Sequence, residues 1–307
     1  MSNTSESQNE VSACANCGKG EESSIDLKSC AACRLVKYCS RECQAAHRPQ
    51  HKRECKKRAK ELYDEKMFKE PPPLEDCPIC MIRLPTLDIG RTYMNCCGKV
   101  ICSGCVHAFR IRAAKAGRLK EDDICPFCRN PTPTTTEAYI KQYEKRAELN
   151  DARAISSLGC YYSKGEHGLP QSNTKALELW HRAGELGCPL AYSNIACMYM
   201  ECGLGDKKKV LHYCELSAIR GNPTGRLNLG TLEGNLGNYD RALKHYMIAV
   251  RMGEAIALET IQQLCKTGLV TKDDYAEALR SYQLYLDDIK SDLRDEAAAF
   301  SDDYKYY

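Results

Sequence analysis

Cysteine and histidine side chains at short, regular spacings dominate the first part of this 307-residue chain. Seven cysteines and one histidine form four pairs, each with two or three residues between its members: Cys14 and Cys17, Cys30 and Cys33, Cys39 and Cys43, and His51 and Cys55. Thiolate and imidazole groups are the usual ligands of tetrahedral zinc, and a two-residue gap lets one tight turn direct both side chains at the same ion. These pairs therefore predict zinc binding.

A second set of cysteines follows the first. Its members are Cys77, Cys80, Cys96, Cys97, Cys102, Cys105, Cys125 and Cys128. At four ligands for each ion, the two sets together suffice for about four zinc ions. Four thiolate or imidazole ligands leave no open position for a water molecule, so we expect structural rather than hydrolytic zinc.

The remaining composition indicates a soluble protein of a reducing compartment. Although the chain has 21 cysteines, its first ten residues, MSNTSESQNE, lack the basic and apolar segments of a secretory signal, so a disulfide framework is not expected. No stretch approaches the ~20 apolar residues that cross a bilayer. The formal charge of +3 is too near neutrality to indicate a nucleic-acid partner. We therefore expect an intracellular protein, cytoplasmic or nuclear, with protein partners and no membrane or small-molecule substrate.

Changes of composition along the chain predict its domains. We expect a disordered leader at 1–12, zinc fingers at 13–55 and 76–130, a basic helix and proline-rich linker at 56–75, helical repeats at 137–290 and an acidic tail at 291–307. A helix over 51–63 should end before Pro71, because proline disfavours the helical conformation of the residue before it. A second helix is predicted over 106–118. The acidic, tyrosine-ended tail is expected to fray.

Seven Lys or Arg residues and a single acid lie between Arg48 and Lys60. Such a run can act as a nuclear localisation signal or contact phosphates. Because no aromatic residues are interleaved with the charges, we favour a solvated helix that caps the first finger.

The region from 137 to 290 repeats itself at intervals of roughly 35 residues. Four residues mark the starts of successive units: Asn150, Gly187, Gly221 and Gly253. Each unit is predicted to hold two helices, and the second helix has an apolar stripe at helical spacing, such as Ala176, Trp180 and Ala183 in the first unit. We expect this stripe, Trp180 included, to pack in the core.

The first unit resembles the Sel-one-like repeat, a relative of the tetratricopeptide repeat, in the segments Leu158-Gly159-x2-Tyr162-x2-Gly165 and Ala176-Leu177-x2-Trp180-x2-Ala183-x3-Gly187. The resemblance implies antiparallel helix pairs stacked in a right-handed α-solenoid, whose concave surface commonly binds proteins. The expected fold class is therefore mainly α, with two small zinc-stabilised cross-brace fingers followed by a right-handed α-solenoid of about four helix pairs.

The first cysteine set, with its segment Tyr38-Cys39-Ser-Arg-Glu-Cys43-Gln followed by His51-Lys and Cys55, resembles the MYND zinc finger. Fingers of this family generally bind short proline-containing peptides, and their ligands interleave. The resemblance implies one zinc on Cys14, Cys17, Cys39 and Cys43, and another on Cys30, Cys33, His51 and Cys55. This chain departs from the family at Arg48, where a tryptophan is usual. His47 is an alternative ligand, but His51 has the expected spacing from Cys55, so we expect His47 at the surface.

The second set, Cys77-Pro-Ile-Cys80 through Cys125-Pro-Phe-Cys128-Arg129, resembles a RING finger. The resemblance implies one zinc on Cys77, Cys80, Cys102 and Cys105, and a second on Cys97, Cys125, Cys128 and the residue at position 99. That residue is Lys99, whose ammonium group has no lone pair for a metal. We therefore favour Cys96 as the fourth ligand, and His107 is its rival.

RING fingers often act as ubiquitin ligases, which position a charged ubiquitin-conjugating enzyme beside a substrate and use no covalent catalytic residue. By this resemblance Ile79 and Pro126 would contact the conjugating enzyme, and the guanidinium of Arg129 would bridge it to ubiquitin. The same side chains could simply cover a zinc-binding turn. The alternative function is a non-enzymatic adaptor whose fingers and repeats all bind proteins. MYND fingers also accompany SET-domain methyltransferases, but the chain has neither the signature motifs nor the room for that domain.

Overall fold

The computed structural model describes residues 13–20, 26–117, 124–201 and 206–307. The predicted leader at 1–12 therefore lies outside the described residues. The chain divides into two compact units, Met1–Lys69 and Glu70–Tyr307. Among the described helices, none combines the length and the apolar character that a membrane crossing requires.

The first unit is built from two short strands and one long helix. Strands β1 (Lys28–Ser29) and β2 (Lys37–Tyr38) pair antiparallel, and α1 (Arg41–Met67) follows. The Oγ of Ser40 caps α1 by accepting a hydrogen bond from the amide of Cys43 at 3.2 Å. The helix includes Pro49 and begins ten residues before the predicted start at 51. The buried apolar cluster of this unit is small and consists of Cys14, Leu27, Cys30, Cys33 and Tyr38, while Met67 is buried at the end of α1.

The second unit begins with a hairpin and a helix. Strands β3 (Arg91–Met94) and β4 (Lys99–Cys102) pair antiparallel, with Arg91 opposite Cys102 and Met94 opposite Lys99. Helix α2 (Ser103–Lys115) follows at once and begins three residues before the predicted start at 106. Its predicted last residue, Arg118, is not among the described residues.

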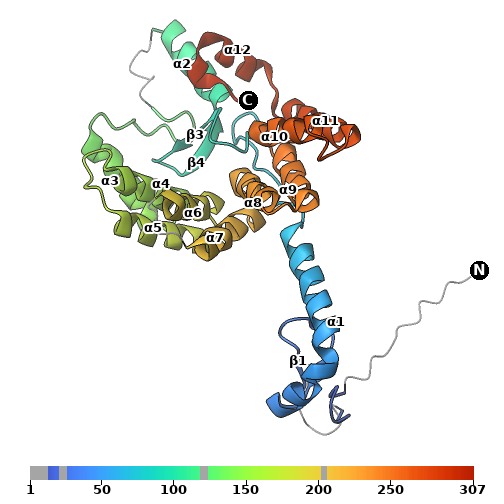
Figure 1. Cartoon of the computed structure of the whole chain (residues 1–307). Helices are drawn as coiled ribbons and strands as arrows, with labels where there is room; N and C mark the ends of the chain where they lie inside the picture. Colours follow the sequence, from blue (N-terminus) through green and yellow to red (C-terminus); the bar gives the residue numbers. More distant parts are fainter. Residues whose placement is uncertain (1–12, 21–25, 118–123, 202–205) are drawn as a thin grey trace, which may run out of the picture. The chain divides into compact units, whose positions relative to one another are not determined.

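A run of antiparallel helices makes up most of the second unit, and Figure 1 shows them stacked side by side as a curved solenoid. They are α3 (Thr136–Glu148), α4 (Ala152–Lys164), α5 (Asn173–Glu185), α6 (Pro189–Glu201), α7 (Lys207–Ile219), α8 (Pro223–Asn235), α9 (Tyr239–Arg251), α10 (Ala255–Lys266) and α11 (Lys272–Ile289). The pairs α4/α5, α6/α7, α8/α9 and α10/α11 are the four predicted units. The expectation of a mainly α chain with a repeat solenoid is confirmed.

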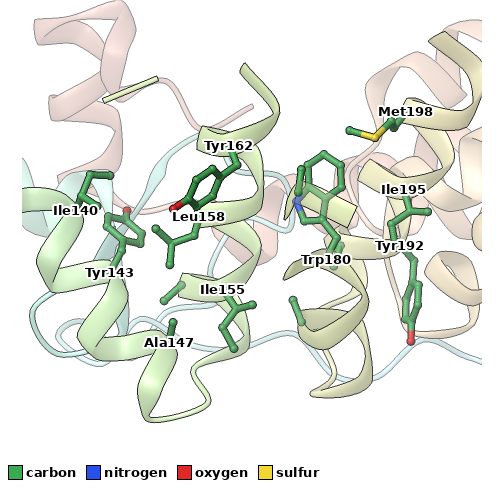
Figure 2. Close-up of a cluster of buried hydrophobic side chains, with 14 residues drawn as sticks. Ile140, Tyr143, Ala147, Ile155, Leu158, Tyr162, Trp180, Tyr192, Ile195 and Met198 are labelled. Carbon is green, nitrogen blue, oxygen red and sulfur yellow. The ribbon is translucent and has the colours of Figure 1, made fainter. Parts of the chain in front are cut away.

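The solenoid core forms from the predicted stripes. Trp180 is 4% exposed and lies among Leu158, Tyr162 and Ile195, as Figure 2 shows. Its indole Nε1 donates a hydrogen bond to the carbonyl of Ser156 at 3.1 Å. Gly159 leaves room for the ring, since a Cβ there would lie 2.5 Å from the indole nitrogen. The prediction that Trp180 packs in the core is confirmed.

The acidic end of the chain does not fray, so that prediction was wrong. Helix α12 (Asp292–Phe300) and the 3-10 turn η3 (Asp302–Tyr304) pack against α2, as Figure 1 shows. The reason is Arg294, which is 0% exposed and donates hydrogen bonds to the carbonyls of Arg83, Ile82 and Ile289. The segment has charged residues on its exposed side, but its other side is buried against the rest of the unit.

The second finger and the solenoid, which we predicted as separate domains, form one compact unit. The hydroxyl of Tyr93 in β3 donates to Asp151 before α4 at 2.9 Å, and the amide of Thr86 donates to Tyr285 in α11 at 3.0 Å. Pro72 packs so closely on the backbone of Gly221 that a Cβ there would lie 2.7 Å from the proline ring. The finger therefore contacts the solenoid near its first helix pair, at Asp151, and near its last helix, at Tyr285.

Candidate metal centres

Four groups of cysteine and histidine side chains meet in the described residues, and within each group the ligand atoms lie within 4.8 Å of one another. The groups are Cys14, Cys17, Cys39 and Cys43; Cys30, Cys33, His51 and Cys55; Cys77, Cys80, Cys102 and Cys105; and Cys96, Cys97, Cys125 and Cys128. The structure thus brings together every candidate ligand in the combinations that the sequence predicts.

The distances between the sulfur atoms fit zinc rather than disulfides. Contacts recorded within the groups include Cys17 to Cys39 at 3.5 Å, Cys30 to Cys55 at 3.8 Å and Cys97 to Cys125 at 3.9 Å. A tetrahedron of sulfur atoms ~2.3 Å from a central zinc has edges of about 3.8 Å, whereas a disulfide bond is ~2.0 Å long. The four groups fit structural zinc ions.

The electrostatics of Cys14 and Cys39 in the first group favour a bound cation. Burial acts to raise the pKa of Cys14, but hydrogen bonds from the backbone of Cys17 and Cys39 outweigh it and lower that pKa to about 6. In the same group, hydrogen bonding of Cys39 to the Cys14 and Cys17 side chains raises the pKa of Cys39 to about 12. The Cys14 thiolate therefore opposes the ionisation of Cys39, and a bound divalent cation would remove that opposition.

Helix α1 carries ligands of both groups in the first unit. Cys43, His51 and Cys55 lie eight and four residues apart, which places them on one side of the helix. Nε2 of His51 is 3.1 Å from Sγ of Cys33. Cys43 in the first turn of the helix thus belongs to the first group, and His51 and Cys55, in the third and fourth turns, belong to the second group.

His47 lies outside these groups. Its Nδ1 is 3.0 Å from the hydroxyl of Tyr38, and its ring stacks on that of His51 with the centroids 5.6 Å apart. The expectation of a surface histidine missed these contacts, which help to fix the orientation of the His51 ring. Arg48, which stands where the MYND family usually has tryptophan, is exposed.

The start of α2 positions the third group. Cys102 is the N-cap residue of this helix, and its Sγ accepts a hydrogen bond from the amide of Cys105 at 3.4 Å. Across the group, Sγ of Cys102 lies 3.8 Å from that of Cys80. The end of β4 and the start of α2 therefore place Cys102 and Cys105 beside the Cys77-x2-Cys80 turn.

The fourth group contains Cys96 and excludes His107. Sγ of Cys96 is 3.4 Å from that of Cys128, and Lys99 is exposed with its ammonium 5.9 Å from the ring centroid of Phe127. The buried ring of His107 instead packs at 4.9 Å from Phe300, in the C-terminal segment. The structure thus places Cys96, and neither Lys99 nor His107, beside the other three thiols.

The predicted contacts for a conjugating enzyme lie on turns next to the cysteines. Ile79 is 43% exposed, Pro126 is half-buried, and the guanidinium of exposed Arg129 lies 5.3 Å above the ring of Phe109. Two apolar side chains that sequence reasoning missed are exposed on the same turns, Met81 at 72% and Phe127 at 43%. The sequence could have predicted this exposure, because a small zinc finger has too little core to bury an apolar residue in or beside a Cys-x2-Cys turn.

Several solved structures are similar to this chain. A Sel1 repeat protein from Oxalobacter formigenes is 25% identical with a TM-score of 0.43, and the match covers 61% of this chain and 81% of that one. The c5321 antigen of uropathogenic Escherichia coli, which displays an SLR fold, is 18% identical with a TM-score of 0.40 over 66% of this chain and 48% of that one. The likeness is weak at these values, and the helix packing by itself establishes the solenoid.

Two curated relatives share a short segment with the chain. The E3 ubiquitin-protein ligase GW2 of Oryza sativa, in both the indica and japonica subspecies, is 31% identical over 74 residues. The match covers 24% of this chain and 15% of the relative, so the chain spans only a small part of the length of these relatives.

A family model matches the first finger. Its description is MYND finger, and it covers residues 14–55, which hold the first and last ligands of the two interleaved groups. Residues 14–55 are therefore a MYND finger.

Proposed function

We propose that this protein is a RING-type ubiquitin ligase that recruits its substrate through the helical repeats and the MYND finger. The finger and the repeat fold support a role in binding other proteins. The observation that carries the ligase proposal is the second finger, whose two interleaved groups of thiols leave Ile79, Met81 and Phe127 exposed beside the metal positions. The short similarity to a rice ubiquitin ligase agrees with it.

In this proposal all sixteen residues of the four groups are zinc ligands, and Cys96 takes the place that Lys99 cannot fill. Zinc here supplies folding free energy and does not activate water, because each group is complete with four protein ligands. The fifteen cysteine thiols of these groups must stay reduced, which agrees with a cytoplasmic or nuclear location.

Catalysis would consist of positioning. Ile79 and Pro126 would pack on the conjugating enzyme, and the five N–H groups of Arg129 would restrain the conjugated ubiquitin in a reactive pose. The stacking of Arg129 on Phe109 orients the guanidinium without occupying all of its donors. No nucleophile of this chain takes part.

An autoubiquitination assay of the zinc-loaded chain across a panel of conjugating enzymes tests the proposal. We expect activity with at least one enzyme, and a loss of about tenfold or more in Ile79→Ala and Arg129→Ala. Ile256→Ala and Arg280→Ala are matched controls, because both residues are exposed on the solenoid far along the chain from the finger, and both should retain activity. No activity with any enzyme, or equal losses in the controls, would refute the ligase proposal.

The second candidate is an adaptor without enzymatic activity. The observation that favours it is that Tyr93, Thr86 and Arg83 join the second finger to the solenoid, so that both could contact one partner protein. An inactive chain that still binds a conjugating enzyme or a peptide would support this candidate.

A further inference from the structure

A cavity of about 520 Å³ lies where the second finger meets the solenoid. The proline-rich segment before the finger, the loop at 84–88 and the hairpin form one wall, and the beginnings of α4, α6 and α8 form the other. This volume falls in the range of sites that bury a small ligand or a few residues of a peptide, which is ~300–1,000 Å³. None of the metal groups lines the cavity.

The cavity has more basic than acidic side chains. Arg91 and Arg153 share one oxygen of Asp88, at 2.7 and 3.5 Å, and Glu75 adds a second carboxylate. Arg220 pairs with no carboxylate among the described residues, and its guanidinium lies 4.8 Å from the ring centroid of Tyr192. One guanidinium is thus held in place by an aromatic ring and left without a counter-ion.

Three helices direct their N-terminal ends at the same cavity. Arg153 in the first turn of α4, Leu190 in that of α6 and Thr224 in that of α8 all line it. The N-terminal end of a helix carries a partial positive charge. Asp151 and Asn222 cap some of the free amides at two of these ends, and the carboxylate of Asp151 offsets the positive end of α4, so that α6 and α8 contribute most of the positive potential.

Buried polar atoms around the cavity also lack partners. Ser156 is 3% exposed, and its Oγ has no hydrogen-bond partner among the described residues. The same holds for Oγ1 of Thr86 and Nε of Arg91, and all three residues line the cavity. An unpaired buried polar atom costs free energy. These three atoms are covered from solvent, so the two hydroxyls can donate to an anionic ligand only when a small shift of the lining exposes them.

The rest of the lining is apolar and suits an extended chain. Pro72, Leu74, Pro85 and Leu190 are among the lining residues. We propose that this cavity binds an acidic peptide, a segment of a partner protein that places an anionic side chain on Arg220 and apolar neighbours against these residues. The inference does not depend on ligase activity, because an adaptor could use the same site.

The test selects ligands from a random library of 12-residue peptides displayed on phage. Clones are selected on the zinc-loaded full chain and depleted on the Arg220→Gln variant, which removes peptides that bind elsewhere, including on the MYND finger. The expected survivors carry Asp or Glu next to apolar residues. The absence of survivors, or survivors without an acidic residue, would overturn the proposal.

One selected peptide is then synthesised, and its dissociation constant is measured in a double-mutant cycle that changes the peptide and Arg220 separately and together. We expect at least a tenfold loss of affinity when its acidic residue becomes the corresponding amide or when Arg220 becomes Gln, and no further loss when both are changed. Arg220→Lys should restore part of the affinity, and Arg280→Gln should have no effect. Additive losses in the cycle would overturn the proposal, as would a thermal midpoint lowered by Arg220→Gln and Arg220→Lys alike.

Two further arms locate the site and identify the anion. Amide exchange should slow at 153–157, 188–190 and 220–224 when the peptide binds, and protection confined to residues 13–67 would contradict the assignment. A phosphoserine version of the peptide distinguishes phosphate from carboxylate. Affinity equal to or above that of the acidic peptide supports the anion site, whereas equal affinity of the neutral amide version refutes it.

Discussion

Adding one methyl group at Gly159 perturbs the packing that holds the solenoid together. A Cβ at this position would lie 2.5 Å from Nε1 and 2.6 Å from Cδ1 of Trp180. Carbon atoms in contact are ~3.5–4.0 Å apart, so the indole of Trp180 must move by about 1 Å. The ring has little space for this, because it is almost fully buried in the cluster of Figure 2.

The expected change in the free energy of unfolding combines three effects. Replacing glycine by alanine inside a helix favours the folded state by ~1 kcal/mol. Overpacking of a filled core opposes it by ~1–3 kcal/mol, and distortion of the hydrogen bond from Trp180 to the carbonyl of Ser156 opposes it by up to ~1 kcal/mol. The three effects sum to ~0–3 kcal/mol, so Gly159→Ala should destabilise the solenoid by a central value of about 1.5 kcal/mol.

Gly234→Ala is the matched control. It introduces the same methyl group inside α8, but the nearest side-chain atoms, in Ala242 and Tyr246, lie at an ordinary contact distance of 3.8 Å. Only the helix-propensity gain remains, and it is reduced near the end of the helix, so this variant should gain roughly 0.5 kcal/mol.

Thermal unfolding followed by circular dichroism compares the two variants, and the fluorescence of Trp180, the single tryptophan of the chain, reports on the perturbed site. We expect Gly159→Ala to lower the midpoint by about 3–6 °C and to shift the emission of Trp180, while Gly234→Ala leaves both unchanged or raises the midpoint slightly. Equal midpoints for the two variants would refute the packing argument.

Three further predictions concern other parts of the chain. Asp151→Asn should destabilise the chain by ~1–2 kcal/mol through weaker bonds to Arg146 and Tyr93. Those bonds outweigh burial and lower the pKa of Asp151, so its contribution to stability is complete above the unfolded pKa of ~3.9 and is lost only as the pH falls through the lower folded pKa. In urea unfolding, the difference in unfolding free energy between wild type and Asp151→Asn should therefore be the same at pH 5.5 and pH 8. A difference that shrinks over that range would contradict the prediction. Removal of residues 291–307 should speed amide exchange in α2 severalfold and leave α1 unchanged, and an unchanged α2 would show that the C-terminal segment does not stabilise the finger. Chelation of zinc should abolish amide protection in residues 26–67, whose apolar core is small, while α4 to α9 keep their helical signal; persistent protection of α1 would show that this unit folds without metal.

Local spacing predicted the cysteine pairs and the repeat starts, whereas the assignment of the pairs to interleaved groups followed from the resemblance to MYND and RING fingers. A Cys-x2-Cys turn, or a glycine before α6, α8 or α10, predicts the conformation of only the few residues around it. Chemistry excludes only Lys99, and the position of His107 two residues past Cys105, at the start of a predicted helix, favours Cys96 over it. The structure adds a reason, since the ring of His107 has aromatic partners in the C-terminal segment.

What the sequence missed depends on contacts between distant residues. The predicted helix starts at 51, yet α1 begins at Arg41 because the capping Ser40 and the metal groups fix its first turns. The acidic composition of the tail concealed the role of Arg294, because two of its three acceptors, the carbonyls of Ile82 and Arg83, lie more than two hundred residues earlier. The contact of Tyr93 with Asp151 and the cavity beside it likewise have no local signature.

Native mass spectrometry of the intact chain tests the central claim most directly, which is that sixteen side chains hold four structural zinc ions in interleaved groups. The wild-type chain should carry four zinc ions, Cys96→Ser should carry three, and His107→Gln should retain four. Four ions in Cys96→Ser together with three in His107→Gln would contradict the assignment of Cys96 to the fourth group.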